Sequence, residues 1–299
     1  MRLSVFHRTH YSYAVPVQSS FNEARLQPTD NELQKRHRFL LKVLPPTRLS
    51  HYMDFYHNCV HMFDLSRPHS ELTIEATSIV TTCNDQGLPN DATPIPLADM
   101  PACGRMERCY DYLQPSHFVN DSVEAWRLAI DVSNHETDAW QTVLKIMRFV
   151  HSAFDYQPSA THVHTTMQEA LKLRKGVCQD FAHVMIGMCR SIKIPARYVS
   201  GYLYNGPAEH LVGSQASHAW VEVYFPKHGW IGVDPTNHRQ VDGHYVKIAV
   251  GRDYADVPPL KGTYLGTGDR LLNVDVLVTL LDANETVTPD AEKRANSAA

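Results

Sequence analysis

The chain reads Gly176-Val177-Cys178-Gln179-Asp180-Phe181-Ala182 over residues 176–182. From Cys178 to Ile192, apolar residues recur every three or four positions, which predicts a buried amphipathic helix that Pro195 prevents from continuing. Cys178 would then begin a helix, where unpaired backbone N–H groups and the positive end of the helix dipole favour a thiolate. Because the thiolate is the nucleophilic form of cysteine, this position suits covalent catalysis. An isolated cysteine is more often a buried structural residue, so the catalytic interpretation needs partners.

Two later segments supply such partners. Residues 217–224 alternate as a strand does, which places His218 on the same face as every second residue after it. Residues 230–237 follow as a second strand, with Asp234 near its end. A hairpin with residue 218 opposite residue 234 would centre its turn at Pro226, and the residues after it favour a turn. This register is one of several that the turn permits.

The three residue types match the roles of nucleophile, base and orienting group. An aspartate bonded to one ring nitrogen of histidine fixes the tautomer, and the other nitrogen then faces the thiol. Each partner also has a structural interpretation, since the chain has 18 histidines and Asp234 before Pro235 is an ordinary turn signal. The joint pattern favours catalysis by Cys178, His218 and Asp234.

Composition excludes several other functions. The chain has 299 residues and a formal net charge of −4, which gives no electrostatic reason to expect a nucleic-acid partner. Its start becomes polar too soon for a signal peptide, and no apolar run is long enough for a membrane span. We therefore expect a cytoplasmic protein without a membrane partner, in which the six cysteines are mostly thiols.

Turn residues and stretches rich in proline and glycine divide the rest of the chain into segments. Residues 1–85 carry short strand-like runs between turn residues, which predicts an N-terminal β-sandwich-like domain. Residues 86–118 are rich in proline and glycine and are expected to form a connection rather than a packed element. Residues 119–285 are expected to form an α+β catalytic domain, and residues 286–299 a flexible polar tail.

Within the expected catalytic domain, helix and strand signals alternate. Asp121 and Ser122 can cap a first helix, Thr137 a second, and a third is expected from Thr166 to Leu173. Strands are expected after the Cys178 helix, at residues 196–203, 219–225, 229–233, 245–250 and 271–281.

The motifs resemble those of a known family. Residues 176–182 are similar to the nucleophile motif of the transglutaminase-like superfamily, residues 217–223 to its histidine motif and residues 233–237 to its aspartate motif. Residues 22–28 and 251–260 resemble the N-terminal domain and the C-terminal signature of bacterial members. The resemblance implies a papain-like α+β core, in which the nucleophile helix packs on an antiparallel sheet. It does not imply protein crosslinking, because members of the superfamily differ in reaction.

Three further residues are candidates for contacts with the oxyanion or the substrate. Acyl transfer needs hydrogen-bond donors for the developing oxyanion, and Tyr156 is a candidate donor beside the backbone N–H of Cys178. Tyr156 would alternatively pack at a helix end. Gln179 would assist or would hydrogen-bond locally, and Trp220 would line the cleft or belong to the core. Asp180 and Arg197 are expected to form a structural ion pair.

No metal or cofactor is expected. His162-Val163-His164 and the pair Cys103 and Cys109 are the nearest approaches to ligand patterns, and neither has the CxxC or HExxH form. The expected reaction is acyl transfer through a thioester on a peptide, protein or small amide substrate. Hydrolysis is favoured because water needs no dedicated second site. The alternatives are transfer to an amine and a non-enzymatic peptide-binding scaffold, which has no need to retain all three residues.

Overall fold

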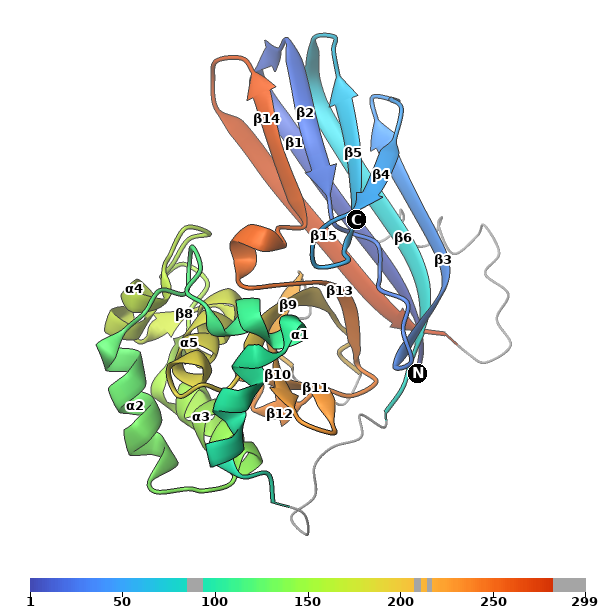
Figure 1. The fold of residues 1–299 in the computed structure, drawn as a ribbon. Coiled ribbons are helices and arrows are strands. Elements are labelled where there is room, and N and C mark those ends of the chain that lie inside the picture. Colours follow the sequence, from blue (N-terminus) through green and yellow to red (C-terminus); the bar gives the residue numbers. More distant parts are fainter. Residues whose placement is uncertain (85–93, 207–210, 214–216, 282–299) are drawn as a thin grey trace.

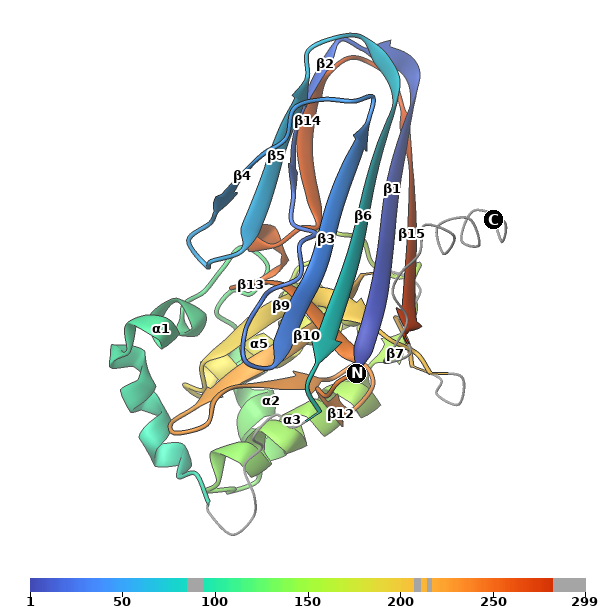
Figure 2. The same ribbon diagram turned by 90° about the vertical axis from the view of Figure 1, so that its right-hand side faces the viewer.

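The computed structural model describes residues 1–84, 94–206, 211–213 and 217–281, which form an α+β fold (Figure 1). A tall β-sandwich stands on a core in which helices pack against an antiparallel sheet (Figure 2). Both parts of the predicted fold class are therefore confirmed. In the described part of the chain, none of the helices combines the length and apolar character that crossing a membrane requires.

The sandwich consists of two four-stranded antiparallel sheets. One sheet has the order β15-β1-β6-β3, formed by Arg270–Leu280, Arg2–Val17, His69–Thr82 and Gln34–Leu44. The other has the order β14-β2-β5-β4, formed by Leu260–Leu265, Ser19–Ala24, Cys59–Leu65 and Ser50–Met53. Alternate residues of the strands point inward, and a buried cluster that includes Phe63, Leu72 and Ile74 fills the space between the sheets.

The last two strands correct the expected domain boundaries. β14 pairs with β2 and β15 pairs with β1, so residues 260–280 belong to the sandwich and not to the expected catalytic domain 119–285. The strand expected at residues 271–281 exists, but its partner lies more than 250 residues earlier in the chain. Residue patterning predicts a strand without identifying the edge on which it pairs.

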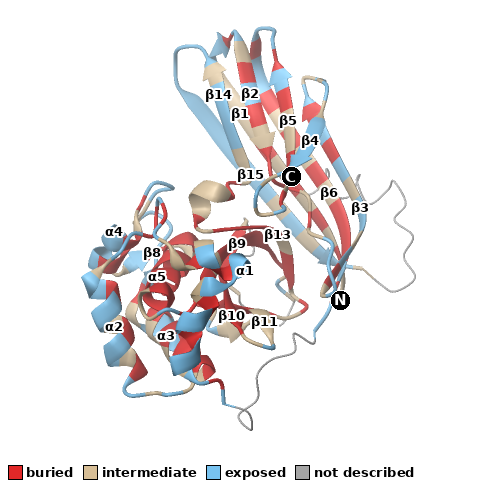
Figure 3. Cartoon of the chain, in the orientation of Figure 1, coloured by how far each residue is buried: buried red, intermediate tan, exposed pale blue. Residues whose placement is uncertain are grey.

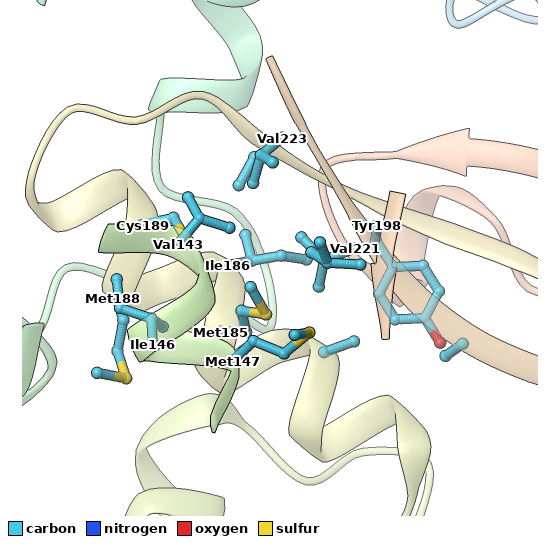
Figure 4. Close-up of a cluster of buried hydrophobic side chains, with 14 of the residues drawn as sticks. Val143, Ile146, Met147, Met185, Ile186, Met188, Cys189, Tyr198, Val221 and Val223 are labelled. Atoms are coloured by element: carbon cyan, nitrogen blue, oxygen red, sulfur yellow. The ribbon is translucent and has the colours of Figure 1, made fainter. Parts of the chain in front are cut away.

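The core is organised around one buried helix. Its sheet has the order β12-β11-β10-β9-β13, formed by Arg239–Gln240, Gly229–Asp234, His218–Phe225, Ala196–Leu203 and Tyr245–Gly251. The helices of the core are α2 (Val123–Ser133), α3 (Ala139–Ala153), α4 (Met167–Leu173) and α5 (Cys178–Ser191). Two short strands, β7 (Asp155–Tyr156) after α3 and β8 (Lys175–Gly176) after α4, pair with each other in parallel. Every residue of α5 from Gln179 to Arg190 is buried (Figure 3). Side chains of α3, α5 and β10, among them Val143, Ile186 and Val221, form one apolar cluster (Figure 4).

One of the two expected helix caps is present as predicted, because Ser122 accepts a hydrogen bond at the start of α2. The third helix, expected from Thr166, begins as α4 at Met167, and Thr166 forms a capping box before it. The cap of α3 is Asp138 instead of Thr137, because the Asp138 carboxylate accepts from the backbone N–H of Gln141.

The segment expected to be an unpacked connection is largely packed. Residues 97–113 form the 3₁₀ helix η1 (Leu97–Arg105), the short helix α1 (Glu107–Tyr110) and the 3₁₀ helix η2 (Asp111–Leu113). Met100, Cys103 and Cys109 are buried in the main core cluster. The expectation was wrong because these apolar residues are spaced irregularly between prolines and glycines, which suits short helices. Residues 85–93 and the expected tail at 286–299 lie outside the described residues.

Two buried amide side chains attach the sandwich to the core. Gln34 accepts a hydrogen bond from the backbone N–H of Lys247 (2.8 Å) and donates to its carbonyl (2.9 Å). Asn58 does the same with Val250, at 2.8 Å for each bond. Both contacts lie on β13, the edge strand of the core sheet. The amides therefore satisfy backbone groups that an unpaired edge would leave free.

Asn58→Ala is expected to lower the free energy of unfolding by about 2–4 kcal/mol, because two buried backbone groups of Val250 lose their partners. Urea unfolding followed by circular dichroism measures the change. The matched control is Asn120→Ala, which removes an exposed amide and should leave the urea midpoint unchanged. Equal midpoints for the two variants would contradict the role of Asn58.

Candidate active site

Cys178 is the first residue of α5, and its surroundings fix the start of that helix. The Asp180 carboxylate accepts hydrogen bonds from the backbone N–H of Val177 (2.8 Å) and from the hydroxyl of Thr161 (2.7 Å). A Cβ at residue 176 would overlap this carboxylate, so only glycine fits there. The Asp180 carboxylate therefore holds the turn that precedes Cys178, and the Cys178 side chain remains partly exposed.

The expected ion pair between Asp180 and Arg197 is absent. Arg197 instead pairs with Glu222, through hydrogen bonds of 2.8 and 2.6 Å to one carboxylate oxygen. Arg197 lies opposite Glu222 on the neighbouring strand, whereas Asp180 already bonds the turn before its own helix.

His218 is the first residue of β10, and Asp234 is the last residue of β11. Nε2 of His218 lies 2.8 Å from Oδ2 of Asp234, and both side chains are buried. The structure thus joins two of the three predicted catalytic residues by a hydrogen bond.

The predicted hairpin register is wrong by two residues. Val221 pairs with Val233 and Phe225 with Gly229, which would place residue 234 opposite residue 220. The three-residue turn contains Lys227 with φ of 71°, and Gly229 has φ of 78°. Because the shift is an even number, His218 and Asp234 still share one face of the sheet and meet as diagonal neighbours.

The Asp234 carboxylate is fully satisfied. Its Oδ2 accepts hydrogen bonds of 2.8 Å from His218 Nε2, Asn237 Nδ2 and the Tyr245 hydroxyl. Its Oδ1 accepts from the backbone N–H groups of Thr236 (2.8 Å) and Asn237 (3.3 Å). Burial alone would raise the pKa of Asp234, but the charge of His218 and these hydrogen bonds hold that pKa below its usual value.

The imidazole of His218 is directed to both partners. Nδ1 is buried and has no hydrogen-bond partner of ordinary geometry among the described residues. Burial alone would lower the pKa of His218, whereas Asp234 and the neighbouring Cys178 thiol raise it to about 10. His218 therefore holds a proton at neutral pH, beside the Cys178 side chain.

The three remaining candidates differ in position. Tyr156 is 37% exposed. Strand pairing of β7 with β8 places it beside Gly176, two residues before Cys178. Burial and the nearby Cys178 raise its pKa to about 12, so the phenol keeps its proton. Gln179 donates to the carbonyl of Val163 (3.2 Å), which lies 16 residues earlier in the chain. Trp220 has no exposed surface and stacks beside His218, so its expected contact with substrate is wrong.

Sequence reasoning missed two residues that bond Asp234. Asn237 stands three residues after it, and a polar side chain at this distance in a turn is a local signal for such a bond. Tyr245 had no signal, because its strand β13 reaches the site through pairing with β9.

The described residues contain no group of three or more His, Cys, Asp or Glu side chains arranged to hold a metal ion. Cys103 and Cys109 are buried thiols in the core.

Comparison with known proteins identifies the family. The model of the transglutaminase-like superfamily matches residues 127–235, and that of the bacterial transglutaminase-like N-terminal region matches residues 3–81. An uncharacterized protein of Mycobacterium leprae (strain TN) is 39% identical over 285 residues, which cover 94% of this chain and 99% of that protein. The chain therefore belongs to the transglutaminase-like superfamily, as its motifs predicted.

Two further proteins extend the comparison. The crystal structure of a putative cysteine protease from Cytophaga hutchinsonii has a TM-score of 0.75 and 24% identity, over 96% of this chain and 92% of that one. This likeness shows a shared fold. A protein-glutamine gamma-glutamyltransferase of Pseudomonas aeruginosa is 37% identical over 97 residues, which are 30% of this chain and 14% of that enzyme. Membership of the transglutaminase-like superfamily supports an enzymatic role.

Asp234→Asn is expected to reduce the alkylation rate of Cys178 at pH 7 by about tenfold or more, because the imidazolium beside the sulfur loses its counter-charge. Iodoacetamide labelling followed by peptide mass spectrometry measures the rate. Retention of the wild-type rate, with the fold intact by circular dichroism, would remove Asp234 from the proposed catalytic group.

The raised pKa of His218 also predicts how stability depends on pH. The ordinary value is 6.5 and the folded value about 10, so the stabilisation is complete below pH 6.5 and is lost as the pH rises through about 10. Urea midpoints of the wild type should therefore fall between pH 7 and pH 10 by more than those of His218→Gln. Parallel curves for the two proteins would contradict the shift.

Proposed function

We propose that this protein is a cysteine-dependent enzyme that cleaves an amide bond through a thioester and completes the reaction with water. The observation that carries the proposal is the buried His218, with one ring nitrogen bonded to Asp234 and the other left for the neighbouring Cys178. In this arrangement Cys178 is the nucleophile, His218 is the base and Asp234 is the group that orients His218.

In the first step, the Cys178 thiolate attacks the carbonyl carbon of the amide and forms a C–S bond. The negative charge that develops on the carbonyl oxygen would be held by the backbone N–H of Cys178 and, in our proposal, by the hydroxyl of Tyr156. The proton on Nδ1 of His218 passes to the nitrogen of the leaving amine, the C–N bond breaks, and a thioester remains.

In the second step, the neutral Nδ1 of His218 takes a proton from water as its oxygen attacks the thioester carbonyl. The C–S bond breaks, the acid leaves, and the thiolate and imidazolium are restored. The sum is one amide and one water converted into one acid and one amine. Asp234 stabilises the imidazolium at the beginning and end of this cycle.

Transfer to an amine is the second candidate, in which an amine replaces water in the second step. The observation that favours it is the 37% identity over 97 residues to the Pseudomonas aeruginosa protein-glutamine gamma-glutamyltransferase. In either reaction we propose a peptide, a protein or a small amide as the acyl donor. A cytoplasmic location is part of the proposal and is supported by the buried thiols Cys103, Cys109 and Cys189, since a reducing compartment keeps cysteines in this form.

Iodoacetamide is expected to label Cys178 at least about tenfold faster than the exposed Cys83 at pH 6.5, because the neighbouring imidazolium favours the thiolate. His218→Ala should abolish the difference. Equal labelling of the two cysteines in the wild type would contradict the proposed nucleophile.

The reaction itself is tested by incubating the protein with peptide libraries and searching for an acyl adduct on Cys178 by mass spectrometry. Products formed with and without added amine distinguish hydrolysis from transfer. Cys178→Ala is the control and should form neither adduct nor product. A Cys178→Ala protein that retains every phenotype of the parent would favour the scaffold alternative.

A further inference from the structure

Asn237 connects the Asp234 carboxylate to a segment of the connection between β9 and β10. Its Nδ2 donates to Asp234 Oδ2 (2.8 Å) and to the carbonyl of Val212 (3.1 Å), and its Oδ1 accepts from the backbone N–H of Val212 (2.8 Å). These bonds use both hydrogens of the amide group and its oxygen. The side chain thus has a defined orientation, with Val212 on one side and the carboxylate on the other.

The residue after Val212 lies against the reactive edge of the imidazole. Gly213 has φ of 90°, and an added Cβ would lie 2.5 Å from Nδ1 and 3.1 Å from Cε1 of His218. No side chain fits at this separation, and L residues rarely adopt this backbone conformation. The main chain at residue 213 therefore covers the ring beside the nitrogen that the proposed mechanism uses.

The segment is held at its other end as well. Leu211 packs against the apolar cluster that contains Trp220 and Tyr245, and its backbone N–H donates to Asn205 Oδ1 (3.3 Å). Tyr245 also bonds Asp234. Residues 211–213 are thus held by hydrogen bonds to Asn237 and Asn205 and by packing of Leu211 on the cluster that includes Tyr245.

We propose that Asn237 is a positioning residue that fixes the main chain of residues 211–213 against His218, so that the imidazole keeps Nδ1 directed at Cys178. This inference rests on the proposed function. The segment would limit rotation of the ring about its Cα–Cβ bond and would form a wall of the site next to the sulfur. Gly213 would be required at this place because any side chain displaces the ring.

The test uses Cys178 alkylation by iodoacetamide between pH 5.5 and pH 9, which needs no knowledge of the substrate. Gly213→Ala is expected to slow the reaction at pH 6.5 by about tenfold or more, since a small displacement of a catalytic group has effects of this size. Its pH profile should approach that of His218→Ala. The matched control is Gly206→Ala in the same connection. Among the described residues an added Cβ there would meet only Tyr204, at 3.8 Å, and the rate should stay at the wild-type value.

A second pair of variants tests the amide. Asn237→Ala is expected to produce the same change in pH profile as Gly213→Ala, whereas Asn120→Ala, which removes an exposed amide, should keep the wild-type profile. Urea midpoints show which variants remain folded. A merely structural role of Asn237 would lower the midpoint and leave the profile of the folded protein unchanged, which would overturn the inference.

The outcomes also distinguish this inference from the proposed function. If the wild type and His218→Ala react alike, Cys178 and His218 do not act together and the proposed function fails. If they differ, but Gly213→Ala and Asn237→Ala react as the wild type does, the proposed function stands and the role of residues 211–213 is wrong.

Discussion

A buried carboxylate with five hydrogen-bond donors lies at the centre of the site, and the state of His218 depends on it. An ionised Asp234 without partners would be costly to bury, but an imidazole, a phenol, an amide and two backbone N–H groups together satisfy both of its oxygens. The charge retained in this way raises the pKa of His218 and fixes the direction of its ring. The protonated ring in turn provides the cation beside Cys178.

The sequence allowed the main parts of the site to be predicted because their signals are local. Helix periodicity identified the start of α5 at Cys178, and strand alternation placed His218 and Asp234 on one face. The predicted register failed because a proline and a following glycine are compatible with turns of several lengths. The error left the pairing intact, since side chains on a strand repeat every two residues. The catalytic roles themselves stay predictions.

The remaining features depend on contacts between distant segments. Tyr245 reaches Asp234 through the order of strands in the sheet, and Gln34 reaches the edge of that sheet from another domain. Trp220 was a candidate to line the cleft or to belong to the core, and tertiary packing buries it entirely. Such contacts follow from topology, which the spacing of residues along the chain does not specify.

The pairing of β14 and β15 with the first two strands makes the core an insertion within the sandwich. The core is connected to the β-sandwich at both its beginning and its end. Any hinge motion between sandwich and core must therefore bend both connecting segments at once. Shortening the chain to residues 1–259 would strip one strand from each sheet and leave the hydrogen-bonding edges of β1 and β2 open to other chains. The sandwich and the core therefore have to be treated as one unit when fragments are designed, because truncating the chain at one position isolates neither of them.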